Sequence, residues 1–250
     1  MIIVRKIQIP QLPTQKPRRL YVYLPKEYNL SDRRYPVLYM FDGHNVFYDS
    51  HATYGKSWGM KEYLEKTRLP LIVVGVECNP EGYKRISEYS PWDEKAPRPI
   101  GPIQGLGKVT MDWITEELKQ EIDRTYRTLP DREHTLIAGS SMGGIMSLYA
   151  VTAYNQVFSR AAALSPVLWY GQKRIGEMIQ KQPLSKPTRV YLDYGTGEAD
   201  KKRGDLDALF ATARKLTRAG ADVDARVVPD AMHSEAYWEQ RIPIFLPYLL

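Results

Sequence analysis

The chain has 250 residues, of which 43% are hydrophobic and 26% charged, and this length and composition predict one globular domain over residues 1–250. No stretch reaches the roughly 20 apolar residues of a membrane-spanning helix, and the single cysteine, Cys78, excludes an internal disulfide. The formal charge of +6 is scattered among acidic residues rather than gathered in a stripe, so nucleic acid is not an expected partner.

The first half of the chain predicts two exposed strands and two buried strands. Residues 3–9 and 18–23 alternate apolar with polar side chains, as exposed antiparallel strands do. Residues 35–41 and 69–76 are almost continuously apolar, which is typical of strands covered on both faces. Helices are expected over 58–66 and 110–125.

Residues 77–108 form the longest irregular segment, with five prolines and several glycines. A loop of this length inside a compact domain is usually functional or disordered, and its tyrosines and Trp92 favour packing. The segment follows a predicted central strand, so we expect it to lie beside the chemistry-bearing strand ends.

In the second half, apolar strands alternate with helices. The predicted strands are 135–138, 159–164, 189–194 and 223–228, and the predicted helices are 144–153, 206–219 and one from about 234 that prolines 243 and 247 interrupt. This alternation indicates a parallel sheet with right-handed crossovers. The fold class is therefore α/β, with a mostly parallel central sheet, helices on both faces and antiparallel N-terminal strands.

The sequence Gly139-Ser140-Ser141-Met142-Gly143 connects a predicted strand directly to a predicted helix. A Gly-x-Ser-x-Gly motif in this position indicates a nucleophile elbow, a sharp turn that presents its central serine. Ser141 is the expected nucleophile. The backbone N–H of Met142, at the start of the helix, would face a developing oxyanion. A plain Gly/Ser turn between a strand and a helix is the alternative.

The general base can be found by elimination among four histidines. His44 and His51 precede the elbow, and His134 opens the strand that leads to the elbow, far from its other end. His233 alone follows the last predicted strand on a loop. The order serine, acid, histidine along the chain is that of α/β-hydrolases. The alternative is a capping or surface histidine before the last helix.

Two carboxylates compete for the acid position. Glu198 and Asp200 both follow the strand that ends near Tyr194, and both could be solvated turn residues. The tight Gly195-Thr196-Gly197 turn places Glu198 just beyond the strand tip, which favours it. Asp200 stays open, and Asp193 is less suited because it lies inside the strand.

The remaining expected site residues come from the loops after two central strands. The backbone N–H of His44 is the expected second oxyanion donor, with its side chain as a wall of the pocket. Asp42 follows the same strand, and Tyr83 and Arg85 lie in the irregular segment. These three side chains are expected to contact substrate, and an aromatic and cationic pair suits a planar or anionic group.

The chain resembles the putative-esterase family of α/β-hydrolases, which includes S-formylglutathione hydrolases, feruloyl and acetyl-xylan esterase modules, siderophore esterases and mycolyltransferases. The matching stretches are 38–47, 88–92, 126–132, 138–144, 164–166 and 233–238, within a resemblance that runs from about residue 18 to the C-terminus. It implies the roles already assigned, with Glu198 as the acid. Many relatives have Gln where this chain has His44, and Asn where it has Ser234, differences that would alter the pocket.

These features predict a serine carboxylic-ester hydrolase that acts through an acyl-enzyme on a small or acylated-carbohydrate ester. Alternatives are an acyltransferase on the same scaffold, a siderophore-lactone esterase and a non-catalytic hydrolase-fold binding protein. No cofactor is expected, and no metal, because no His/Cys cluster has ligand spacing. The N-terminal residues become charged too early for a signal peptide, and a single cysteine excludes an internal disulfide, so a cytoplasmic location is expected. The expected partner is a small-molecule ester, with no membrane partner, and homo-oligomerisation stays open.

Overall fold

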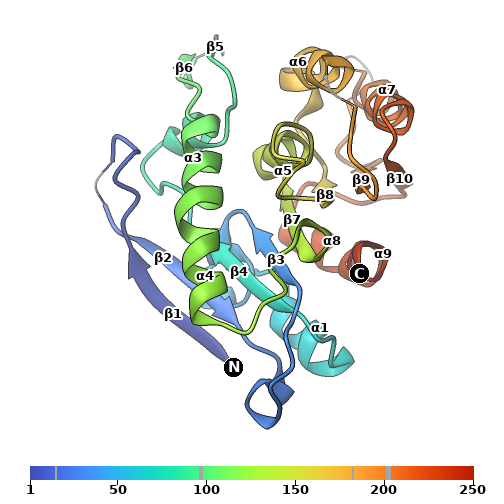
Figure 1. The fold of residues 1–250 in the computed structure, drawn as a ribbon. Coiled ribbons are helices and arrows are strands. Elements are labelled where there is room, and N and C mark those ends of the chain that lie inside the picture. The colour runs from blue at the N-terminus through green and yellow to red at the C-terminus, as the bar shows by residue number, and fades with distance from the viewer. Residues whose placement is uncertain (15, 96–97, 182, 201–203) are drawn as a thin grey trace.

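A twisted sheet runs through the molecule, and helices cover both of its faces (Figure 1). The computed structural model describes residues 1–14, 16–95, 98–181, 183–200 and 204–250. The described residues form an eight-stranded sheet in the order β1-β2-β4-β3-β7-β8-β9-β10. Its strands are β1 (Ile2–Ile7), β2 (Arg18–Tyr23), β3 (Val37–Met40), β4 (Ile72–Val76), β7 (Thr135–Ser140), β8 (Arg160–Leu164), β9 (Arg189–Gly195) and β10 (Asp222–Val228).

Strand direction divides this sheet into two parts. β2 pairs antiparallel with both β1 and β4, whereas the pairs from β4 through β3, β7, β8 and β9 to β10 are parallel. A separate two-stranded hairpin of β5 (Glu94–Lys95) and β6 (Pro102–Ile103) lies outside the sheet. The predicted fold class, a mostly parallel α/β sheet with antiparallel N-terminal strands, is confirmed.

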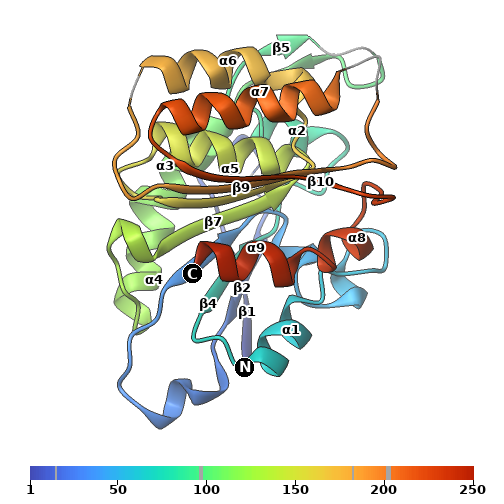
Figure 2. The same cartoon turned by 90° about the vertical axis from the view of Figure 1, so that its right-hand side faces the viewer.

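The helices form two layers, which Figure 2 shows edge-on. One face of the sheet carries α3 (Gly107–Trp113), α4 (Lys119–Thr125), α5 (Met142–Ala153), α6 (Leu168–Lys181) and α7 (Asp205–Arg218). The other face carries α1 (Met60–Thr67), α8 (Glu235–Glu239) and α9 (Ile242–Leu249). A π-helical turn over Ile114–Leu118 joins α3 to α4, and the short α2 (Lys84–Glu88) follows β4.

The side-chain period of a strand distributes the apolar residues between these layers. In β3, Val37 and Tyr39 pack into the core beneath α3 to α7, while Leu38 and Met40 pack into the core beneath α1, α8 and α9. All four side chains of β3 are buried, as the continuous apolar run predicts. Because the strands from β4 to β10 are parallel, their carboxyl ends lie at the same edge of the sheet, between the two helical layers.

Four features of individual elements differ from what the sequence predicts. β2 is buried rather than exposed, because its side chains pack into the cores on both faces of the sheet. The helix α6 is not anticipated, since its two glycines weaken the helical pattern. In the structure the β-carbon of any larger residue at Gly171 would lie 3.0 Å from the ring of Trp92. The segment 77–108 contains α2 and the β5–β6 hairpin, and the predicted last helix is two, α8 and α9.

Within the described part of the chain, every helix is too short or too polar to cross a bilayer.

Candidate active site

Ser141 occupies a strained turn between β7 and α5. Its φ of 59° and ψ of −122° lie outside the regions that non-glycine residues favour. The turn is tight because Gly139 and Gly143 touch, and a β-carbon on Gly139 would lie 2.7 Å from the carbonyl carbon of Gly143. The N–H of Ser141 donates to the carbonyl oxygen of Leu164 at 3.0 Å, which ties the turn to β8. This is the backbone geometry of a nucleophile elbow.

Ser141 lines a cleft of about 660 Å³ at the carboxyl edge of the sheet. The segment after β4 contributes Asn79, Tyr83 and Arg85 to the lining. His233, in the loop after β10, and Glu235, the first residue of α8, also line the cleft. The structure thus brings the expected nucleophile, the expected base and the irregular segment to one cavity.

The imidazole of His233 contacts the carboxylate of Glu198. Its Nδ1 lies 2.5 Å from Oε2 of Glu198, and the carboxylate side chain is only 3% exposed whereas that of His233 is 42% exposed. Burial opposes ionisation of Glu198, but hydrogen bonds from His233, Ser165 and Gly195 bring its pKa below the ordinary value. Asp200 is exposed two residues further on, where its N–H donates to Asp205 at 2.9 Å.

Glu198 is held from behind by buried polar side chains that sequence reasoning did not select. Its Oε1 accepts a hydrogen bond from Ser165 at 2.5 Å and one from the N–H of Gly195 at 2.9 Å. The guanidinium of Arg241 lies 3.7 Å from the same oxygen and donates to Asp193 at 2.9 Å. Ser165 lies in the stretch 164–166 that resembles the esterase family, but the resemblance assigns this residue no role. Arg241 could not be found from the sequence, because it approaches Glu198 only in the folded structure.

Both expected oxyanion donors lie in helical turns next to the cleft. Met142 is the first residue of α5, where N–H groups have no acceptor within the helix. His44 is in the middle of the short turn Gly43–Asn45, whose closing hydrogen bond runs from the N–H of Asn45 to Asp42 at 2.8 Å and leaves out the N–H of His44. The turn packs against β4, and a β-carbon on Gly43 would lie 2.3 Å from Gly75.

Asp42 is paired with Arg85 rather than free for substrate. Arg85 donates from Nε and Nη2 to the two carboxylate oxygens, each at 2.7 Å. The aspartate side chain is 8% exposed and that of Arg85 28%. Although burial opposes its ionisation, Arg85 lowers the pKa of Asp42. Both side chains were expected to contact substrate, and both line the cleft. Their charges, however, already compensate each other within the protein through the bidentate pair.

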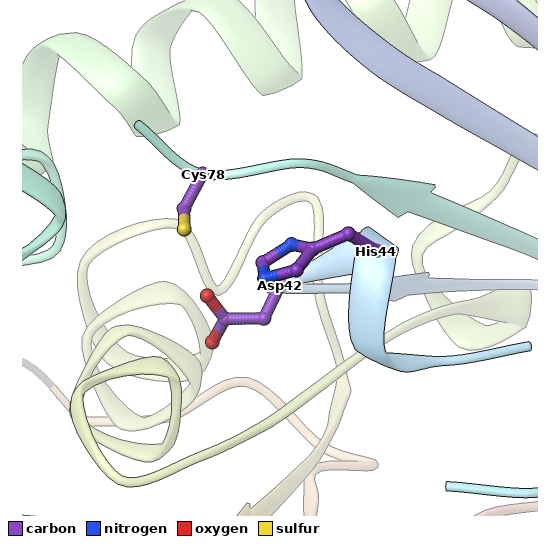
Figure 3. Close-up of side chains that lie close together, drawn as sticks. All are labelled: Asp42, His44 and Cys78. Carbon is purple, nitrogen blue, oxygen red and sulfur yellow. The ribbon is translucent and has the colours of Figure 1, made fainter. Parts of the chain in front are cut away.

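Asp42, His44 and Cys78 cluster in a way that resembles a metal site (Figure 3). Their potential ligand atoms lie within 4.8 Å of one another. The chemistry fits a cation poorly, however. Both oxygens of Asp42 already accept from Arg85, and Nε2 of His44 lies 2.9 Å from the hydroxyl of Thr53. Burial raises the pKa of the Cys78 thiol, which disfavours the thiolate that binds metals.

We expect Arg85→Ala to lower the free energy of unfolding by about 2–3 kcal/mol, because it leaves the buried Asp42 carboxylate unpaired. Urea denaturation at neutral pH measures this difference. Arg5→Ala is the control, since the side chains of its pair with Glu121 are 38% and 42% exposed and the pair should contribute about 1 kcal/mol or less. The contribution of Asp42, whose pKa is lowered, is present above the ordinary aspartate pKa of about 3.9 and is lost as the pH falls further. Equal losses in both variants would contradict this prediction.

Comparison with known proteins identifies relatives that cover most of the chain. A family model described as “Putative esterase” matches residues 13–249. The uncharacterized protein YbbA of Bacillus subtilis (strain 168) is 26% identical over 189 residues, which cover 74% of this chain and 71% of that protein.

Solved structures show the same fold at low sequence identity. An IroE-like serine hydrolase from Shewanella oneidensis superposes with a TM-score of 0.77 at 21% identity, covering 95% of this chain and 77% of that one. The siderophore hydrolase EstA from Aspergillus nidulans gives a TM-score of 0.76 at 18% identity, covering 99% of this chain and 94% of the other.

Proposed function

The chain belongs to the family described as “Putative esterase”, and from this premise we propose that it is a serine carboxylic-ester hydrolase that forms an acyl-enzyme at Ser141. Membership of an esterase family supports ester hydrolysis in general. One observation carries the finer proposal: the imidazole of His233, hydrogen-bonded to Glu198 at 2.5 Å, lines the same cleft as the strained Ser141.

In the proposed first step, the hydroxyl of Ser141 attacks the ester carbonyl carbon. His233 takes the hydroxyl proton as the new bond forms, and Glu198 holds the imidazole with its proton on Nδ1 so that the other ring nitrogen faces the serine. The carboxylate also stabilises the imidazolium that results. Its lowered pKa supports this role, because Glu198 stays ionised at neutral pH.

The tetrahedral intermediate carries its negative charge on the former carbonyl oxygen. We assign the backbone N–H groups of Met142 and His44 to this oxygen, each contributing on the order of 3 kcal/mol to the transition state. The intermediate collapses when His233 returns the proton to the departing alcohol. Water, deprotonated by His233, then attacks the acyl-enzyme. The bond to Oγ of Ser141 breaks as His233 returns the proton to that oxygen, and the carboxylic acid leaves.

The lining of the cleft favours an uncharged, hydrogen-bonding substrate. Its two arginines each pair with a carboxylate, Arg85 with Asp42 and Arg19 with Glu77 at 2.6 Å. Neither cation is therefore available to neutralise a strongly anionic ligand, while Thr53, Asn79 and two tyrosines offer polar contacts. A small ester or an acylated carbohydrate fits this lining best.

A fluorophosphonate probe tests the proposed nucleophile, because it reacts with an activated serine and leaves an ordinary one unmodified. We expect a single adduct on Ser141, located by peptide mass spectrometry. A panel of aryl acetates, acetylated sugars, feruloyl esters and a siderophore lactone then measures selectivity. The lactone is included because similar structures include a siderophore hydrolase. An unlabelled protein that hydrolyses none of these esters would refute the proposal.

We expect Tyr83→Ala to change the relative kcat/KM values across this ester panel by several-fold while the fold is kept. Tyr83 lines the cleft and is 51% exposed, so its ring is available to a bound alcohol or acyl group. The control is Phe210→Ala, which removes an aromatic ring of comparable exposure from α7, outside the cleft. Parallel changes for all esters in the Tyr83 variant would exclude a role in selectivity.

A further inference from the structure

Ser165, the residue that follows β8, is fully buried and makes three hydrogen bonds through one hydroxyl group. Its Oγ lies 3.0 Å from the indole Nε1 of Trp238, 3.0 Å from Nη1 of Arg241 and 2.5 Å from Oε1 of Glu198. These partners come from α8, from the residue before α9 and from the loop after β9. The hydroxyl therefore joins three separate parts of the chain behind the cleft.

The chemistry of the three partners fixes the direction of every hydrogen bond. An indole N–H and a guanidinium N–H can only donate, and a hydroxyl has one proton and two acceptor lone pairs. Trp238 and Arg241 occupy both lone pairs of Ser165. Its proton must then go to the carboxylate of Glu198, because no other arrangement satisfies all three contacts.

The backbone of Ser165 is held in a conformation that serine rarely adopts. Its φ is 45°, in the left-handed region, and it precedes Pro166, which restricts it further. Its N–H donates to the carbonyl oxygen of Asp193 at 3.1 Å and to the carboxylate of the same residue at 3.2 Å. Such strain persists where the surroundings over-determine the geometry, commonly at functional sites.

We propose that Ser165 is a positioning residue of the reaction: its hydroxyl, oriented by Trp238 and Arg241, donates to Glu198 in every step and keeps this carboxylate ionised and directed at His233. The inference rests on the proposed function and deepens it. Ser165 acts through Glu198 and lies outside the cleft lining, so it should affect the protonation of the catalytic pair and leave substrate binding unchanged.

The sign of the effect follows from the direction of the hydrogen bond. A donor to a carboxylate favours its ionised form, so removal of the donor raises the pKa at which the Glu198–His233 pair loses its proton. The active form, with Glu198 ionised and His233 neutral, would then appear only at higher pH. The acidic limb of the kcat/KM profile should move in the same direction.

The test compares Ser165→Ala and Ser165→Gly with Ser159→Ala. Glycine tolerates the positive φ, so the second variant keeps the test valid if alanine impairs folding. Ser159 is a matched control, because it is equally buried at the other end of β8 and donates to the carbonyl oxygen of Arg132 at 2.7 Å, outside the site. The readouts are an NMR titration of the His233 ring and the pH dependence of aryl acetate hydrolysis.

In both Ser165 variants we expect the titration midpoint of the pair to rise by about one pH unit, the equivalent of one hydrogen bond to a charged group. On the acidic limb kcat/KM should fall about tenfold at fixed pH, with KM unchanged. Ser159→Ala should lower thermal stability and leave both profiles in place. A midpoint that stays at the parent value in both Ser165 variants would overturn the inference.

The two proposals can fail separately. If a fluorophosphonate probe leaves Ser141 unlabelled, the proposed function fails, but the NMR titration still measures whether Ser165 controls the pair, since it needs no substrate. If Ser141 is labelled and the titration midpoints coincide, the esterase mechanism stands and Ser165 is only structural.

Discussion

Replacing Ser141 by alanine should abolish ester hydrolysis, with a loss on the order of 10⁶ in kcat, the size found when the nucleophile of a comparable serine hydrolase is removed. Thermal stability should change little, because the Ser141 hydroxyl faces the cleft instead of the core and alanine inherits the same backbone strain. The measurement is kcat for an aryl acetate together with the melting temperature of each variant.

The neighbouring residue provides the control for this experiment. Ser140 ends β7 and is 6% exposed, so Ser140→Ala removes a hydroxyl of the same kind one position earlier. Its effect on rate should be far smaller. A Ser141→Ala enzyme with activity within tenfold of the parent would remove this serine from the mechanism.

Replacing Glu198 by glutamine should lower kcat by about 10⁴, the loss that follows when a triad histidine is held in the wrong tautomer. A glutamine amide can donate to Nδ1 of His233, which would place the ring proton on the nitrogen that must accept from Ser141. Asp200→Asn is the matched control, because this carboxylate follows two residues later and is exposed. If Asp200→Asn is the damaging change and Glu198→Gln is mild, the two assignments must be exchanged.

The same glutamine variant has a pH signature in stability. Because the pKa of Glu198 is lowered in the folded protein, its ionised form stabilises the fold above the ordinary glutamate pKa of about 4.3. That contribution is lost as the pH falls through the lowered value. The difference in melting temperature between Glu198→Gln and the parent should therefore be largest near neutral pH and shrink in acid.

The sequence by itself determined the features that depend on residues close together along the chain. Strand and helix periodicity follows from which side chains face the core, so the parallel half of the sheet could be predicted, and a glycine on each side of Ser141 indicated the elbow. The chain order of Ser141, Glu198 and His233 could also be read directly. β2 shows the limit of this method, because its alternating pattern suggested exposure while its side chains pack into the cores on both faces of the sheet.

Only the tertiary structure decided which distant side chains meet. The side chain of Glu198 contacts His233, whereas Asp200, two residues later in the same loop, is exposed and donates its backbone N–H to Asp205. The pairing of Arg85 with Asp42, and the convergence of Trp238 and Arg241 on Ser165, join residues more than 40 positions apart. Local pattern contains no record of such contacts, because they form only when separate elements pack and each buried polar group must find its partner.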